Sequence, residues 1–163
     1  MSRKAIIGTL IALFIAVFAY FSFVQIQPQE IENEPDWMVL QDAIDQAAVD
    51  NRLILVDIFE VGCQWCRKMN REVYPSPTIR SILDREFHPV KVNGNSDNRI
   101  VFLGEEISEQ EFASRMGLTA FPFTVVLDAE GNVIDRRRGY MDTQGLSRFL
   151  RNALEINSAS ASL

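Results

Sequence analysis

The sequence predicts an α/β domain that is preceded by one N-terminal transmembrane helix. Two observations carry this prediction. Short apolar runs typical of strands alternate with segments whose apolar residues recur at helical spacing, and the last three segments are ordered strand, strand, helix. Before them lies a stretch of twenty residues without a charge, 5–24, which as a helix would reach about 30 Å, the thickness of the hydrocarbon core of a bilayer.

Length and charge limit what the chain can be. Its 163 residues suffice for one anchor and one domain, and a content of 47% hydrophobic and 23% charged residues is that of a globular protein with a core. Of the 16 basic residues, Arg3 and Lys4 precede the apolar stretch, whereas all 22 acidic residues follow it. The domain is therefore acidic, which argues against nucleic acid or an anionic membrane surface as a partner.

The flanking charges orient the apolar stretch. After Arg3 and Lys4, no lysine or arginine follows until Arg52, so residues 1–4 should stay in the cytoplasm while the rest is exported. Cleavage is the competing outcome, because Val17-Phe18-Ala19 has residues that a signal peptidase reads, although the apolar run is longer than that of a usual signal peptide. In either case the domain would work outside the cytoplasm.

Residues 25–35 are polar and acidic and contain two prolines, which favours an extended linker. The domain should begin at Asp36, which can cap a helix that continues to about Asp50. Trp37 begins the apolar stripe of this helix and is predicted to anchor it in the core; the other members of the stripe are Leu40, Ile44, Ala47 and Ala48.

The run Leu53–Phe59 is short, apolar and rich in β-branched residues, and it predicts a buried central strand. Asp57 is the anomaly, because an unpaired carboxylate in such a strand would be costly and should respond with a raised pKa or with a partner. Only Glu60-Val61-Gly62 separates the strand from Cys63, so Asp57 would lie beneath the cysteines. Alternatively, Asp57 sits at an exposed edge or binds a backbone amide.

Cys63 and Cys66 are the only cysteines and flank Gln64-Trp65. A helix predicted from Cys66 to Tyr74 would place Cys63 at its N-terminus, where the helix dipole lowers a thiol pKa. A c-type haem would require histidine in place of Arg67, and zinc or an iron–sulfur cluster usually requires four ligands, so no metal or other cofactor is expected. The pair is then either redox-active or an inert disulfide.

The rest of the chain predicts further helices and strands around this motif. Helices are expected at Pro77–Asp84, Ser108–Met116 and Asp142–Leu154, and strands at Phe87–Asn93, Phe123–Asp128 and Val133–Arg138. His88, the single histidine, has no cysteine or histidine nearby and is interpreted as a surface or packing residue. Pro122 precedes a strand, where a cis peptide bond would turn the chain. Residues 157–163 are expected to be a flexible tail.

Together these segments resemble the thioredoxin-like superfamily, and the Gly-Cys-x-Trp-Cys form resembles its exported bacterial members. The resemblance covers residues 36–156. It implies the thioredoxin fold, a central mixed β-sheet flanked by helices. The residues that carry it are Leu53–Asp57 leading to Cys63-Gln64-Trp65-Cys66, Ala120–Thr124, Asp128–Gly131 and Gly139-Tyr140.

The resemblance also implies roles for individual residues. Cys63 would be the attacking thiolate, Cys66 the resolving thiol, and Asp57 the buried carboxylate that assists proton transfer to and from Cys66. Pro122 would be the cis-proline beside the pair. Substrate contacts would come from Trp65, Phe121 and Pro122.

The activity so implied is thiol–disulfide exchange, as a protein-disulfide reductase tethered to the bacterial inner membrane with its domain in the periplasm. Its partners would be protein thiols and disulfides and a transmembrane thiol electron donor. A disulfide oxidase or isomerase is the alternative within redox chemistry, because Gln64-Trp65 and Phe123 depart from the usual family residues and bear on the direction of electron flow. A non-catalytic binding module with an inert disulfide is the alternative outside it.

Overall fold

A computed structural model describes residues 2–26 and 31–160. The chain divides into two compact units, Met1–Glu30 and Ile31–Leu163. The first contains helix α1 (Arg3–Ile26), along which apolar side chains such as Phe14 and Phe18 are exposed. No helix among the described residues reaches the length and hydrophobicity that crossing a membrane requires. The anchor at 5–24 therefore stays a prediction, and part of the expected linker, 27–30, lies outside the described residues.

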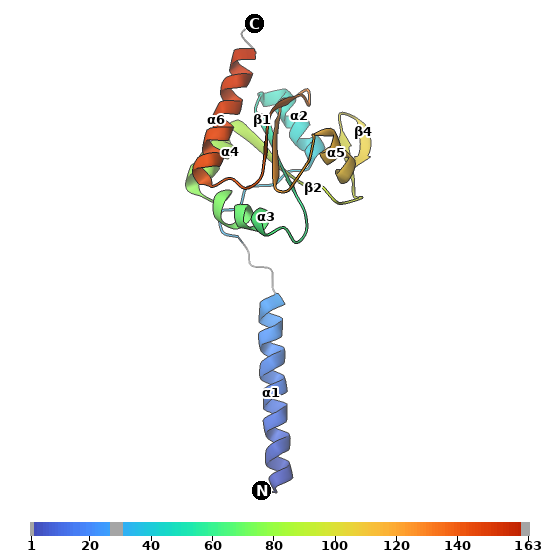
Figure 1. Cartoon of the computed structure of the whole chain (residues 1–163), viewed down its shortest axis with the longest axis vertical. Coiled ribbons are helices and arrows are strands. Elements are labelled where there is room, and N and C mark those ends of the chain that lie inside the picture. The colour runs from blue at the N-terminus through green and yellow to red at the C-terminus, as the bar shows by residue number, and fades with distance from the viewer. Residues whose placement is uncertain (1, 27–30, 161–163) are drawn as a thin grey trace. The chain divides into compact units, whose positions relative to one another are not determined.

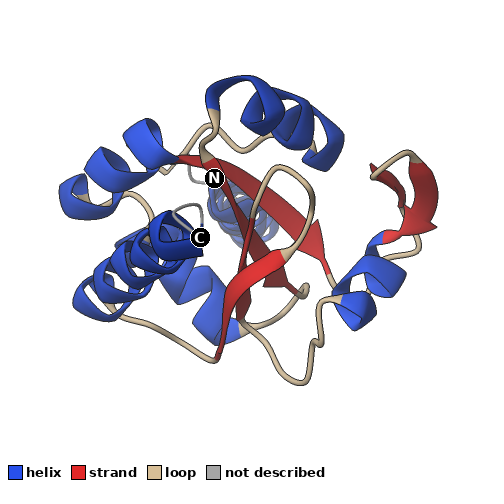
Figure 2. Ribbon diagram, turned by 90° about the horizontal axis from the view of Figure 1, so that it is seen from above, coloured by secondary structure: helices blue, strands red, loops and turns tan. Residues whose placement is uncertain are grey.

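A four-stranded mixed sheet forms the centre of the second unit, as expected (Figure 2). Its strands are β1 (Leu53–Phe59), β2 (Phe87–Asn93), β5 (Phe123–Leu127) and β6 (Val133–Arg138), in the order β2-β1-β5-β6. Strand β1 runs parallel to β2 and antiparallel to β5, and β5 runs antiparallel to β6. The most apolar strand, β1, is thus central, with neighbours on both sides.

Helices cover both faces of this sheet (Figure 1). Helices α2 (Leu40–Asp50) and α5 (Glu109–Arg115) pack on one face, against Ile54, Val56 and Ile58 of β1. Helices α4 (Pro77–Glu86) and α6 (Thr143–Ser160) pack on the other face, where they contact Leu53 and Leu55. Because side chains alternate along a strand, Asp57 points to this second face.

The helix that contains Cys66 is divided into two parts. Helix α3 (Gln64–Lys68) passes directly into a π-helical turn, η1 (Met69–Val73), whose last residue is followed by Tyr74 in helical conformation. The predicted helix from Cys66 to Tyr74 is therefore present, but with an unexpected π turn in its second half. This turn buries Met69 and Val73, and Tyr74 after it is buried too.

The segment between Asn93 and Met116 holds a hairpin that the sequence did not indicate. Strands β3 (Arg99–Phe102) and β4 (Glu105–Ser108) pair antiparallel, and Leu103 and Gly104 form the turn with positive φ angles. The helix expected after Ser108 is confirmed as α5, and the Ser108 Oγ accepts a hydrogen bond from the Glu111 amide at 3.0 Å.

The start of the domain differs from the prediction. Helix α2 begins at Leu40, after Val39, and Asp36 does not cap it. The reason is that Met38 pairs with Val90 as an isolated β-bridge, which holds the chain extended before the helix. Trp37 consequently lies outside the helix, where its half-buried ring meets Tyr74 edge-on at 5.1 Å between ring centroids.

His88 and the C-terminal tail are two further regions for which the sequence makes a prediction. His88 is a packing residue, as one of the two predicted roles states, because its ring is buried and its Nε2 lies 3.1 Å from Asp50 Oδ1. Helix α6 continues to Ser160, past the expected end at Leu154, so residues 157–160 of the expected flexible tail are helical. Residues 161–163 of that tail lie outside the described residues.

Candidate redox site

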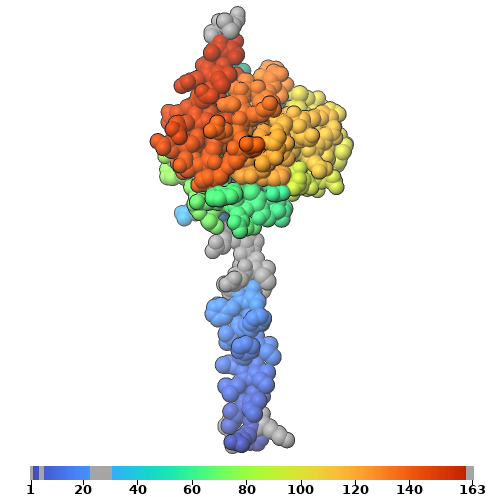
Figure 3. All heavy atoms as spheres, in the orientation of Figure 1, coloured from blue at the N-terminus to red at the C-terminus, as the bar shows by residue number. Residues whose placement is uncertain are grey.

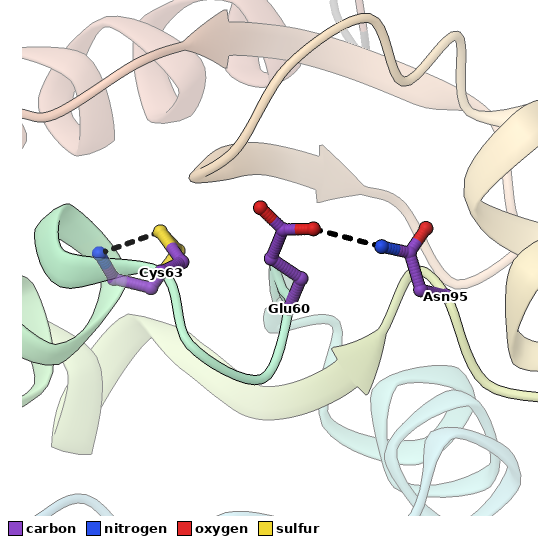
Figure 4. The surroundings of a disulfide bond; sticks show 4 residues. Glu60, Cys63 and Asn95 are labelled. Atoms are coloured by element: carbon purple, nitrogen blue, oxygen red, sulfur yellow. Dashed lines mark hydrogen bonds between the residues drawn. A yellow bond between two sulfur atoms is a disulfide. The ribbon is translucent and has the colours of Figure 1, made fainter.

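Cys63 and Cys66 form a disulfide with an S–S distance of 2.10 Å at the N-terminus of α3, directly after the loop that follows β1 (Figure 4). Cys63 is the N-cap of α3, and its Sγ accepts a hydrogen bond from the Cys66 amide at 3.0 Å. Cys63 is half-buried, whereas Cys66 is only 5% exposed. The two sulfurs are therefore unequal, and an external group can approach Cys63 more readily.

The loop before the cysteines makes this turn possible. Strand β1 ends at Phe59, and Gly62 takes a φ of +93°, a conformation that favours glycine. The Cys63 amide donates to the Glu60 carbonyl at 3.3 Å, while the Glu60 carboxylate accepts from Asn95 Nδ2 at 2.8 Å (Figure 4). The loop is thus tied to the chain beyond β2, and the segment from α3 to η1 reaches the molecular surface (Figure 3).

Asp57 is almost completely buried, at 2% exposure, in the central strand of the sheet. Its position excludes the alternative that it lies at an exposed edge. It lines a pocket of about 330 Å³ together with Cys66, Asn70 and Lys91. The structure therefore brings Asp57 and the buried cysteine to one cavity, as the sequence predicts.

Burial raises the pKa of Asp57 from 3.8 to about 6, against the opposing effects of Lys91 and Tyr74. Asp57 Oδ1 has no hydrogen-bond partner among the described residues. Burial and the Asp57 carboxylate in turn raise the pKa of Tyr74 well above its ordinary value. Asp57 is consequently a group that exchanges a proton close to neutral pH.

Lys91 and Tyr74 belong to this site but were not predicted from the sequence. Asp57 is in register with Lys91 of β2 on one side and with Thr124 of β5 on the other. The three side chains therefore share one face of the sheet. For Lys91 a signal exists, since it interrupts the buried Val90 and Val92 in the strand that follows the one carrying Asp57. For Tyr74 the sequence offers no comparable signal.

An aromatic surface lies close to the cysteines. Trp65, between them in sequence, is 55% exposed, and its ring centroid lies 5.2 Å from that of Tyr140. Lys68 Nζ lies 5.6 Å from the Trp65 centroid and 5.2 Å from the Tyr140 centroid, within range of a cation–π interaction. Trp65 is therefore accessible to a partner that approaches Cys63.

The peptide bond between Phe121 and Pro122 is cis, which confirms the expectation for Pro122. Pro122 is buried and precedes Phe123, the partner of Ile58 in β1, so it lies beside the strand end from which the cysteine loop departs. Phe121 is half-buried and packs against the core that contains α2 and α5. The structure thus leaves part of Phe121 open to solvent near the site.

Gly94 packs closely against the ring of Phe121. A Cβ added to Gly94 would lie 2.7 Å from Phe121 Cε1 and 3.0 Å from Ile58 Cγ2. We therefore expect Gly94→Ala to displace the Phe121 ring and to lower the free energy of unfolding by about 1–3 kcal/mol, as overpacking does. Chemical denaturation measures this loss. In a Phe121→Leu background, where the ring is absent, Gly94→Ala should lower the free energy of unfolding by less than it does in the wild type. An equal loss of stability in the two backgrounds would contradict the steric explanation.

A disulfide of two cysteines spaced as Cys-x-x-Cys, at the turn that follows the central strand of a mixed sheet, fits a thiol–disulfide oxidoreductase. Comparison with protein families agrees with this class. The family model of the thioredoxin-like domain matches residues 40–154, and the chain belongs to this family. Comparison with curated protein sequences finds no match.

Solved structures share the fold at low sequence identity. The oxidoreductase DsbH is 20% identical, with a TM-score of 0.59 over 80% of this chain and 92% of DsbH. A thioredoxin from Thermus thermophilus is 22% identical, with a TM-score of 0.58 over 72% of this chain and 85% of its own. The C-terminal domain of Neisseria meningitidis DsbD, in the oxidised form, is 17% identical, with a TM-score of 0.54 over 70% of this chain and 92% of the DsbD domain. At these identities the similarity establishes the fold alone.

Proposed function

We propose that the protein is a membrane-tethered protein-disulfide reductase of the exported compartment, acting through the Cys63/Cys66 dithiol. The observation that carries the proposal is the unequal exposure of the two cysteine sulfurs next to Asp57. Cys63 can be reached from outside, whereas Cys66 lines the pocket that also contains the Asp57 carboxyl. Thiol–disulfide exchange needs this pair, an attacking thiolate that meets the substrate and a resolving thiol that does not.

The reaction starts from the dithiol form. The Cys63 thiolate attacks one sulfur of a substrate disulfide, which breaks the substrate S–S bond, forms a mixed disulfide and releases the first substrate sulfur as a thiolate that takes a proton from solvent. Asp57 accepts the proton of Cys66, whose thiolate then attacks Cys63 Sγ and releases the second substrate sulfur as a thiolate, to which the proton held by Asp57 can return. Two electrons pass to the substrate, and the Cys63–Cys66 disulfide seen here remains.

Substrate contacts are assigned to Trp65, Phe121 and Pro122. Trp65 exposes an aromatic face next to Cys63, and the cis peptide at Pro122 precedes a strand whose partner ends at the cysteine loop. Exposed aromatic side chains supply much of the binding energy in protein recognition. The substrate is accordingly a polypeptide, held across Trp65 while its disulfide meets Cys63.

Tethering and location are part of the proposal. The uncharged stretch 5–24, with Arg3 and Lys4 before it, supports a single-pass anchor in the inner membrane with a cytoplasmic N-terminus. In a periplasm kept oxidising, a reductase must be recharged from the cytoplasmic side. A transmembrane carrier with its own dithiol is the electron donor that this requirement implies.

The direction of electron flow is tested by the reduction potential. Equilibration of the full chain with glutathione buffers, followed by quantification of the free thiols, should give a value near that of thioredoxins, about −270 mV, rather than near that of strong thiol oxidases, about −120 mV. A potential at the oxidising end would overturn the reductase in favour of an oxidase. A disulfide that does not exchange at all would leave only the non-catalytic binding module.

A further inference from the structure

The segment Ile31–Val39 lies before the matched family domain, which begins at residue 40, and it contacts the chain after η1, helix α4 and Lys91 of the redox-site pocket. Asn33 Nδ2 donates to the Pro75 carbonyl at 2.6 Å, and Arg80 Nη1 donates to the Glu34 carbonyl at 2.6 Å. The segment is therefore held from two directions, by the chain after η1 and by α4. This attachment places the Glu34 side chain at a fixed position.

Glu34 holds the ammonium group of Lys91. Its Oε1 accepts hydrogen bonds from Lys91 Nζ at 2.9 Å and from Trp37 Nε1 at 2.8 Å. Lys91 Nζ also donates to Asn70 Oδ1 and lies 4.3 Å from the centroid of the Trp37 ring. The cation is thus enclosed by a carboxylate, an amide oxygen and an aromatic face.

From its position in the sheet, the Lys91 ammonium group could pair with Asp57 instead of Glu34. Its Cα is in register with that of Asp57 on the neighbouring strand, and both side chains line the same pocket. Nevertheless, within residues 2–26 and 31–160 the only salt bridge of Lys91 is with Glu34, and Asp57 Oδ1 stays without a hydrogen bond. Turned toward Asp57, the ammonium would hold that carboxyl in its charged form.

We propose that Glu34 is a positioning residue that keeps Lys91 away from Asp57, so that Asp57 can take up and release a proton during exchange. The inference rests on the proposed function for the use of that proton. It assigns a role in the chemistry to a residue that precedes the family domain. The segment Ile31–Val39, which includes the last residues of the expected linker, is thereby coupled to the redox site.

The other groups around Asp57 cannot take over the role of Glu34 in holding the charge of Lys91 away from Asp57. Tyr74, after η1, and Thr124, on β5, are neutral. Arg67, on α3, and Glu60, after β1, line the same pocket and carry opposite charges. For Glu34, burial acts to raise the pKa, but Lys91, Trp37 and Asn70 together lower it. Glu34 is therefore anionic at neutral pH and able to neutralise Lys91.

Glu34→Gln in the oxidised full chain tests the inference. The variant keeps an oxygen acceptor but loses the charge, and the freed ammonium should turn toward Asp57. Carbon-13 NMR of labelled aspartate carboxyls, with the Asp57 signal assigned through Asp57→Asn, should show its titration midpoint move from about 6 to lower pH. In a Lys91→Met background the same substitution should leave the midpoint unchanged, because the cation that mediates the effect is gone.

Asp36→Asn is the matched control. It removes the same charge from the same segment, but Asp36 is exposed and its carboxylate lies 3.9 Å from Arg80. It should leave the Asp57 midpoint in place. Asn70→Ala removes the other oxygen that holds Lys91, so it should shift the midpoint in the direction of Glu34→Gln, and it carries the test if Glu34→Gln does not fold.

Two results would overturn the inference: an unchanged midpoint in Glu34→Gln, or an equal shift with and without Lys91. The proposed function fails separately. If the midpoint moves as expected while the pH profile of disulfide exchange stays where it was, Glu34 does position Lys91, but Asp57 does not transfer the proton of Cys66.

Discussion

Cys66→Ser should convert the protein into one that captures its substrates covalently and does not release them. Cys63 keeps its half-buried position at the N-terminus of α3 and can still attack a disulfide. The resolving thiol is absent, so the mixed disulfide on Cys63 persists and multiple turnover falls to the background rate. Adducts on the full-length variant, separated without reductant and identified by mass spectrometry, measure this result and name the substrates.

Cys63→Ser is the matched control for this experiment. It leaves Cys66 as the single cysteine, but that side chain is 5% exposed, so few adducts should form and turnover should again be absent. Equal trapping by both variants would show that burial does not distinguish the sulfurs. Failure of Cys66→Ser to form any adduct would favour the non-catalytic module with an inert disulfide.

The elements that the sequence predicts well are those with a strong local signal. Leu53–Phe59 is continuously apolar and became the central strand, and Ser108 has a hydroxyl and a downstream glutamate that define a helix start. The hairpin of β3 and β4 was missed because Arg99–Phe102 has no clear alternation, and its strands are stabilised mainly by packing of Phe102 and Ile107 in the core. Packing between segments that are distant in the sequence does not produce a periodic pattern of apolar residues.

The same distinction holds for the redox site. The cysteine spacing and the polar Asp57 within an apolar strand are visible in the sequence, and the structure places Asp57 and Cys66 at one pocket. Glu34 and Lys91 are 57 residues apart, and only the parallel register of β1 and β2 makes both relevant to Asp57. The spacing of Trp37 relative to Leu40 and Ile44 predicts a helix, but the β-bridge at Met38 prevents the helix from starting so early.

Asp57→Asn should stabilise the oxidised protein at neutral pH while slowing exchange. Burial raises the pKa of Asp57 from 3.8 to about 6 on folding. Between these values the folded state binds the proton more tightly than the unfolded state, so the free energy of unfolding falls as pH rises through this window. Above it the charged carboxyl costs about 3 kcal/mol, which the neutral amide does not.

Denaturation of the oxidised proteins at two pH values measures this difference. Asp57→Asn should exceed the wild type by up to about 3 kcal/mol at pH 8, and the gain should disappear below the ordinary pKa of an aspartate, where both side chains are neutral. Asp97→Asn, in an exposed loop, should show no such pH-dependent gain. Because the amide cannot accept the proton of Cys66, resolution of mixed disulfides should slow in the same variant. Equal stability changes at both pH values would mean that Asp57 is not the buried, proton-exchanging group on which the mechanism depends.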